Sequence, residues 1–331
     1  MNVPFFPNPC TYVKESTIKI LPKLSHVTID EASLEKFISE ILKNENLLQI
    51  PTWSKCHFEA SSVDIETLLR YIFTIDTLNF CFWPNEGFEY DNLAKNLYEP
   101  IKQKTDFFEM ENLIKITPQN LQDVVFKCNF CLLEERARMI REVFTIIKNE
   151  YNGLCTNFVK ECNKDATKLV KKIIDNFCCF RDAAIYNGEQ IFFYKRAQIL
   201  VSDLYLAFLD IMNSKKNNEE NDIINFTQDS ISQLTMFADY RVPQILRAKG
   251  ILSYDKYLSE LVDNKKELAH GGKEEVEIRA STIQAVEKIK NELAKKGKKV
   301  LSIEIDVYLW GEGEKLKDKI LPHHRTLSIF Y

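Results

Sequence analysis

The chain has 331 residues, of which 45% are hydrophobic and 28% are charged, the balance of an ordinary folded globular protein. Its net charge of −4 creates no strong field toward nucleic acid, and no apolar run approaches the roughly 20 residues that span a bilayer. These values exclude a disordered chain and a strongly basic nucleic-acid binder, and we expect no membrane partner.

The cysteine pattern indicates the compartment. Nine cysteines are scattered along a chain that is large enough to be stable without disulfide bonds. An odd number without regular spacing is typical of reduced thiols. The first ten residues, MNVPFFPNPC, lack the charged start and the apolar stretch of a signal peptide. We therefore expect a cytoplasmic protein.

Residues 1–28 are predicted to form an irregular N-terminal arm, because prolines cluster near their start and little periodicity follows. Asp30 can cap a helix, and the apolar residues that follow it return on one helical face. These residues are Leu34, Phe37, Ile38, Ile41 and Leu42. A second helix is predicted from about Asp64 into the segment 76–80, and Pro84 ends the aromatic segment after it.

Further helices are predicted downstream from apolar spacing and capping signals. One starts at Thr117-Pro118, an N-cap followed by proline in the first turn. The others cover residues 134–151, 164–177, 194–212, 254–262 and 281–295. Residues 213–221 are all polar and are predicted to form an exposed loop. Residues 300–310 fit either a strand or a helix, so we predict a mostly α protein with at most a small β element.

Residues 233–250 (QLTMFADYRVPQILRAKG) place Asp239 and Arg241 between apolar residues. Pro243 predicts a helix that is broken or bent at this point. A carboxylate among aromatic residues is a candidate for chemistry, because burial and a nearby cation set its pKa. An Asp–Arg ion pair on a helix surface is also common in proteins. The residue types alone leave both interpretations open.

Several short segments resemble, in the same order, the landmarks of one protein family. They are residues 76–84 (DTLNFCFWP), 193–200 (FYKRAQIL), 233–250, 274–280 (EEVEIRA), 306–310 (DVYLW) and 322–325 (PHHR). On these segments the chain resembles the queuosine salvage family, whose members are queuosine 5'-phosphate N-glycosylases (hydrolases). The resemblance implies a single helical domain over residues 29–331. The implied fold is compact and similar to the helix-hairpin-helix DNA glycosylases, although their glycine-rich hairpin is not evident in this sequence.

The resemblance implies a hydrolase that cleaves the N-glycosidic bond of queuosine 5'-monophosphate, releasing queuine and ribose 5-phosphate for tRNA modification. Positive charge builds on the sugar as such a bond breaks, so a carboxylate is needed near the anomeric carbon. Asp239 matches the family's catalytic aspartate, as nucleophile or as electrostatic stabiliser. Lys195 is the second catalytic candidate, which orients Asp239 or holds the phosphate. Arg196 and Arg241 are alternative phosphate ligands.

The resemblance also favours a base pocket with aromatic walls. Asn79, Phe82 and Trp83 are expected on one side, because aromatic faces stack on a flat heterocycle and an amide reads its polar edge. Phe237 and Tyr240 are expected on the other side. Without the family, an aromatic cluster of this kind is more often part of a hydrophobic core.

The DVYLW segment contributes Asp306 and Tyr308 to the predicted binding residues. A carboxylate at Asp306 can accept hydrogen bonds from the N1–H and amino group of a guanine-like edge. In the family a second acid often follows the tryptophan, but here Gly311 follows Trp310. No role is therefore assigned to a second acid.

No cofactor or metal is expected. Cys128 and Cys131 form a single CxxC without a second ligand pair at zinc-like spacing. The alternative to a hydrolase is a non-catalytic protein that binds queuine or its nucleotide, or a tRNA-associated protein. The net charge of −4 argues against a stable nucleic-acid partner, and a DNA glycosylase would need a basic groove. A simple binding protein would tolerate the loss of Asp239, whereas a hydrolase would not.

Overall fold

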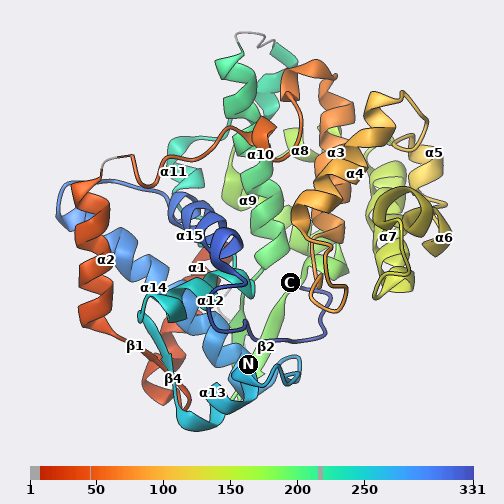
Figure 1. Ribbon diagram of the computed structural model, residues 1–331. Helices are drawn as coiled ribbons and strands as arrows, with labels where there is room; N and C mark the ends of the chain where they lie inside the picture. The colour runs from red at the N-terminus through yellow and green to blue at the C-terminus, as the bar shows by residue number, and fades with distance from the viewer. Residues whose placement is uncertain (1–7, 45, 215–218) are drawn as a thin grey trace.

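The computed structural model describes residues 8–44, 46–214 and 219–331. Helices make up most of these residues, and two short two-stranded sheets lie in the lower part of the molecule in Figure 1. The prediction of a mostly α protein is therefore confirmed, whereas the likeness to helix-hairpin-helix DNA glycosylases stays a prediction. No helix in the described part of the chain is long and apolar enough to cross a membrane.

The prediction of an irregular arm over residues 1–28 is wrong, because helix α1 (Pro9–Ile20) lies within it. Asn8 caps this helix: its side-chain oxygen accepts a hydrogen bond of 2.9 Å from the backbone N–H of Cys10. Pro9 occupies the first helical position, where its missing N–H leaves no hydrogen bond unmade and its fixed φ suits the helix. One of the prolines that indicated irregular structure is therefore a helix start signal.

The other predicted helices are present, with ends that differ by a few residues. They are α2 (Glu31–Lys43), α3 (Ile65–Leu78), α6 (Pro118–Asn120), α7 (Leu133–Glu150), α9 (Ala166–Asn176), α10 (Lys195–Asn213) and α13 (Lys256–Asp263). Further helices are α4 (Tyr90–Lys102), α5 (Met110–Leu113), α8 (Cys155–Lys160), α11 (Gln228–Ile231) and α12 (Arg241–Ala248). Short 3₁₀ segments are η1 (Leu21–Lys23), η2 (Trp53–Lys55), η3 (Ala60–Ser62), η5 (Cys178–Phe180) and η6 (Glu219–Ile224), and η4 (Leu121–Phe126) is a π-helical segment.

The last third of the chain is more helical than predicted. α14 (Lys273–Lys295) begins directly after Gly272 and not near Ser281. The prediction missed its first turns because they are buried on several sides and lack a one-sided apolar pattern. The ambiguous residues 300–310 belong almost entirely to α15 (Ser302–Leu316), which packs against α12 and α14. Pro243 lies in the first turn of α12, so that a helix begins at this point and is not broken there.

The predicted exposed loop over residues 213–221 is described only in part. Residues 215–218 lie outside the described residues. Asn213 is the last residue of α10, and residues 219–221 belong to η6. Asn221 is buried, so this end of the predicted loop is packed against the protein.

The two small sheets are antiparallel. β1 (Val27–Ile29) pairs with β4 (Leu252–Tyr254), which joins the N-terminal part of the chain to the segment after α12. β2 (Ala183–Tyr186) and β3 (Glu189–Phe192) form a hairpin. Its two turn residues, Asn187 and Gly188, both have positive φ, as an Asn-Gly hairpin turn requires.

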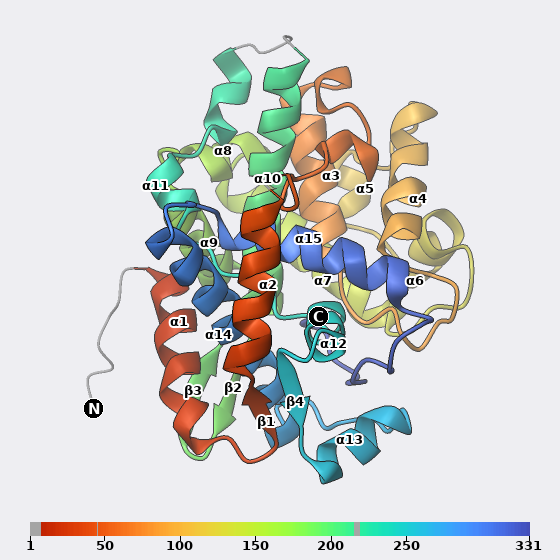
Figure 2. The same cartoon turned by 60° about the vertical axis from the view of Figure 1, so that its left-hand side comes forward.

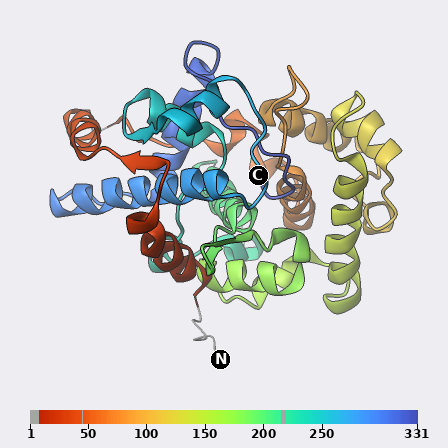
Figure 3. The same cartoon turned by 90° about the horizontal axis from the view of Figure 1, so that it is seen from below.

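Two long helices organise the core. α10 packs against α3 and α9, and α14 packs against α1, α2 and α15. Figure 2 shows α2 in front with α1 beside it, and Figure 3 shows α14 running across the molecule. The C-terminus lies inside this arrangement, where the backbone carbonyl of Tyr331 accepts a hydrogen bond of 3.0 Å from the N–H of Cys81.

One buried ion pair joins α14 to the segment that precedes α10. Arg279 and Asp182 are each 1% exposed and share hydrogen bonds of 2.9 and 2.6 Å. The guanidinium lies against the rings of Phe193 and Tyr331, and its Nε donates to the carbonyl of Ala238 at 2.9 Å. Removing one partner of such a pair leaves the other charge buried without compensation.

We predict that Asp182→Ala lowers the free energy of unfolding by about 3–5 kcal/mol, because the Arg279 guanidinium then keeps only its longer contact of 3.5 Å with the buried carboxylate of Glu275. Urea unfolding at pH 7 measures this change. Glu135→Ala is the control, since it breaks an exposed pair with Arg138 and should cost less than about 1 kcal/mol. Equal effects of the two substitutions would contradict the prediction.

Candidate active site

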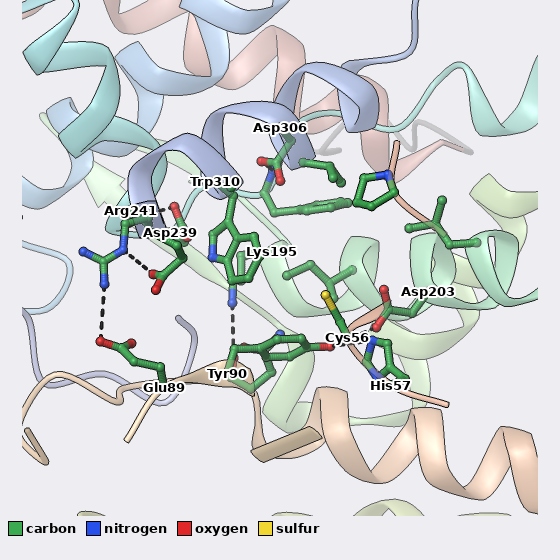
Figure 4. Close-up of a pocket in the computed structure, with 18 of the residues that line it drawn as sticks. Cys56, His57, Glu89, Tyr90, Lys195, Asp203, Asp239, Arg241, Asp306 and Trp310 are labelled. Atoms are coloured by element: carbon green, nitrogen blue, oxygen red, sulfur yellow. Dashed lines mark hydrogen bonds and ion pairs between the residues drawn. The ribbon is translucent and has the colours of Figure 1, made fainter. Parts of the chain in front are cut away.

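A pocket that encloses about 200 Å³ lies between α10, α12, α15 and the end of α3. Its walls are mainly aromatic and aliphatic, with several carboxylates and basic groups among them (Figure 4). The structure brings together eight of the predicted site residues in this lining. They are Asn79, Phe82, Lys195, Phe237, Asp239, Tyr240, Arg241 and Asp306.

Three predicted site residues lie outside the pocket lining. Arg196 follows Lys195 on α10 and points about 100° away from it around the helix axis. Its guanidinium is buried in the core, where it donates to backbone carbonyl groups. The indole N–H of Trp83 donates to a backbone carbonyl of the C-terminal segment, and Tyr308 stacks on Phe37. The structure therefore gives these three side chains no contact with the pocket.

Asp239 is half-buried at the N-terminus of α12. Its Oδ1 accepts hydrogen bonds from the backbone N–H groups of Arg241 and Val242, at 3.0 and 2.9 Å. These bonds fix the carboxylate and, with the helix dipole, favour its charged form. Burial has the larger effect and raises the pKa of Asp239, while the charge of Lys195 opposes it. Oδ2 accepts no hydrogen bond from the residues that the structure describes, so it is available to a ligand.

Lys195 is the first residue of α10, and its side chain is 4% exposed. Its backbone N–H donates to Asp182 at 3.1 Å, so the buried ion pair also positions this residue. Its Nζ donates to the backbone carbonyl of Asn79 at 3.2 Å. Burial lowers the pKa of Lys195 to about 8, and the negative charge of Asp239 opposes that effect. At neutral pH the amine is therefore mostly protonated.

Asp306 lies on the face of α15 that lines the pocket. It is 5% exposed and accepts a hydrogen bond of 3.0 Å from the backbone N–H of Phe237. Burial raises the pKa of Asp306 well above its ordinary value, and the charge of Asp239 raises it further. The two carboxyl groups therefore have different electrostatic environments, and Asp239 is the one with direct support from a helix N-terminus.

Arg241 lies at one end of the pocket (Figure 4). Its Nε donates to Glu314 at 2.6 Å, and its second terminal nitrogen lies 3.5 Å from Glu89. Gly313 allows the side chain to cross α15 closely, because a Cβ at that position would lie 2.8 Å from Cγ of Arg241. The guanidinium is thus held by two carboxylates.

The other end of the pocket contains residues that sequence reasoning missed. Figure 4 shows Cys56, His57, Tyr90 and Asp203 grouped there. Asp203 follows Lys195 by eight residues on α10, a spacing that falls within one broad helix face, and both side chains line the pocket. The other three come from segments without a recognisable motif. Within the described residues, no group of three or more His, Cys, Asp or Glu is arranged to hold a metal ion.

The fold and the site together define a mostly helical protein with an aromatic-walled pocket suited to a small ligand. The chain belongs to the queuosine salvage protein family, whose family model matches residues 56–331. This match confirms the resemblance that the sequence segments indicated.

Relatives with the name queuosine 5'-phosphate N-glycosylase/hydrolase match nearly the full chain. The protein from Dictyostelium discoideum is 39% identical, with 98% of this chain and 100% of the relative covered. The protein from Sphaerobacter thermophilus is 34% identical, with 96% and 97% covered. The protein from Mus musculus is 29% identical, with 96% and 98% covered. The similarity therefore extends over the whole length of these relatives and is not confined to a shared segment.

We predict that Asp239→Asn lowers the pKa of Lys195 below about 8, because it removes a negative charge that opposes the effect of burial. An NMR titration of isotope-labelled lysine side chains measures this pKa. Asp229→Asn, at an exposed position on α11, is the control and should leave the pKa unchanged. An unchanged pKa in Asp239→Asn would contradict the electrostatic coupling of the two residues.

Proposed function

We propose that this chain hydrolyses the N-glycosidic bond of queuosine 5'-monophosphate and releases queuine and ribose 5-phosphate. The observation that carries the proposal is that Asp239 and Lys195 line the same pocket and that the charge of each opposes the effect of burial on the other. The names of the relatives support the substrate, and the family supports a role in queuine salvage over that of a non-catalytic carrier. In the reaction, water oxygen bonds to the anomeric carbon, and the base leaves with the electrons of the broken bond and gains a proton.

Asp239 is the proposed catalytic carboxylate. Oδ1 is held by the helix N-terminus, and Oδ2 is the oxygen available to face the sugar. As the bond breaks, positive charge develops at the anomeric carbon, and a carboxylate that is already fixed in position stabilises that charge. The same oxygen serves either as a nucleophile or as an electrostatic stabiliser. Lys195 keeps this carboxylate ionised against the cost of burial.

The chemistry of the leaving group increases the demand on Asp239. Queuine is a 7-deazapurine, so a carbon replaces the ring nitrogen that many purine-releasing enzymes protonate. Protonation at that position is therefore not available to assist departure of the base. More of the catalysis must come from stabilisation of the sugar cation and from delivery of water, which is consistent with a carboxylate that is oriented before the substrate binds.

Aromatic side chains are the proposed base-binding surface. Phe82, Phe237 and Tyr240 line the pocket as predicted, and Trp310 adds a further ring from α15. Rings of this kind stack on flat heterocycles. Asp306, one helical turn before Trp310, is proposed to bind the polar edge of the guanine-like base.

Arg241 is the proposed phosphate ligand among the three basic residues that the sequence indicated. It lies at the pocket end near Asp239, whereas Arg196 is buried behind α10. A phosphate at this end would have to replace Glu314 or Glu89 as the partner of the guanidinium. We place the reaction in the cytoplasm, in agreement with nine free thiols.

The direct test is incubation of the purified protein with queuosine 5'-monophosphate, with free queuine measured by chromatography. We expect release by the wild type and a loss of at least about 100-fold in kcat for Asp239→Asn, because the carboxylate charge is removed. Asp229→Asn should retain normal turnover. Thermal unfolding must show that all variants are folded.

Two outcomes would contradict the proposal in different ways. Normal turnover by folded Asp239→Asn would exclude its catalytic role. Tight binding of the nucleotide by the wild type without release of queuine would exclude hydrolysis and indicate a carrier.

We also predict a bell-shaped dependence of kcat/KM on pH. Activity requires ionised Asp239, whose raised pKa places the acid limb above the ordinary range of an aspartate. Activity also requires protonated Lys195, so that it declines as pH rises through about 8. Lys195→Arg should move the alkaline limb to higher pH, because a guanidinium stays protonated. A wild-type profile that remains flat between about pH 8 and 10 would contradict the role of Lys195.

A further inference from the structure

The end of the pocket opposite Arg241 contains a carboxylate that the proposed hydrolysis does not use. Asp203 lies on α10 and is 8% exposed. One of its oxygens accepts a hydrogen bond of 3.3 Å from the Tyr90 hydroxyl, and that hydroxyl lies 3.4 Å from the imidazole of His57. Figure 4 shows these side chains together at the pocket wall. The carboxyl group of Asp203 therefore lines the part of the pocket that a ligand can occupy.

A second acid lies behind the first. Asp76 on α3 is fully buried, and neither carboxyl oxygen has a hydrogen-bond partner among the residues that the structure describes. Burial raises the pKa of Asp76 well above its ordinary value, and the charge of Asp203 raises it further. Burial also raises the pKa of Asp203 to about 7. Two interacting acids in a buried environment favour a positively charged ligand, because a cation offsets the cost of ionising them.

Lys195 opposes the effect of burial on the pKa of both acids, and the buried Arg196 does so on the pKa of Asp76. Of the cations that line the pocket, Arg241 is at the opposite end and Lys195 is in the middle (Figure 4). Burial lowers the pKa of His57 to about 3, so its imidazole is neutral. Lys195 also interacts with Asp239 and Asp306, which leaves Asp203 with only a share of its charge.

The length of the pocket fits a base with a long substituent. Lys195 and Asp203 lie on one face of α10, separated by eight residues or about 12 Å along the helix axis. If the sugar lies beside Asp239, the base extends along α10 in the direction of Asp203. Queuine differs from 7-deazaguanine by a substituent at position 7, in which a basic secondary amine links the base to a cyclopentene diol.

We propose that Asp203 binds the ammonium group of the position 7 substituent and so determines specificity for queuosine 5'-monophosphate over nucleotides of unsubstituted deazaguanine. The Tyr90 hydroxyl, which already contacts Asp203, orients the carboxylate toward this group. An ammonium–carboxylate contact at a buried carboxylate is stronger than one on the surface, and Asp203 is buried. This inference rests on the proposed hydrolase function, because it assumes that substrate.

The test compares two substrates, queuosine 5'-monophosphate and 7-deazaguanosine 5'-monophosphate, in the wild type and in Asp203→Asn. We expect the substitution to raise KM for queuosine 5'-monophosphate at least 10-fold and to change the kinetics of the unsubstituted nucleotide less than about 2-fold. Asp210→Asn is the matched control: Asp210 is also buried on α10 but accepts hydrogen bonds from Ser54 and Ala60 away from the pocket lining. It should leave the ratio between the two substrates unchanged.

Equal effects of Asp203→Asn on both substrates, or no effect, would overturn the assignment. Failure of the wild type to hydrolyse either nucleotide would instead contradict the proposed function, so that the two failures are distinguishable.

A second measurement needs no substituted protein. Binding of 7-aminomethyl-7-deazaguanine is compared with that of 7-ethyl-7-deazaguanine, which has the same shape without the charge. We expect the wild type to bind the charged base at least 10-fold more tightly, and equal affinities would overturn the proposal.

Discussion

The buried ion pair of Arg279 and Asp182 is the interaction on which the rest of the site depends. Asp182 accepts a hydrogen bond from the backbone of Lys195, and Arg279 donates to the carbonyl of Ala238, directly before Asp239. One charge pair therefore positions both proposed catalytic residues, although they lie far apart in the sequence. Because the pair is almost fully buried, it is held in one geometry. Its hydrogen bonds to the backbone of Lys195 and Ala238 therefore fix the positions of these two pocket segments.

Electrostatic balance is the second constraint on the site. Asp203, Asp239 and Asp306 line a small pocket in which Lys195 occupies the middle. Burial raises the pKa of each carboxyl group and lowers the pKa of the amine, so the charged forms depend on one another. Only Asp239 gains additional support from backbone N–H groups at a helix N-terminus. This local difference separates a carboxylate suited to catalysis from carboxyl groups suited to ligand recognition.

Much of the fold could be predicted wherever one face of an element is apolar and the other is polar. Helices α2 and α3 begin close to the positions that Asp30 and Asp64 indicated. The predictions failed for α1, where prolines suggested irregular structure, and for the first turns of α14, which are buried on several sides. In those segments tertiary packing determines the structure, and a one-sided pattern is absent or misleading.

By itself, the sequence determined the helical class, because local spacing is a property of short segments. It also carried the family resemblance, and that resemblance identified Asp239 and Lys195 as candidates. Only the tertiary structure decided that Arg196 faces the core while its neighbour Lys195 faces the pocket, and that Asp203 joins the site. Orientation and electrostatic environment depend on contacts between distant segments. Such contacts arise only when the chain is packed, and they set the pKa values on which the proposed chemistry depends.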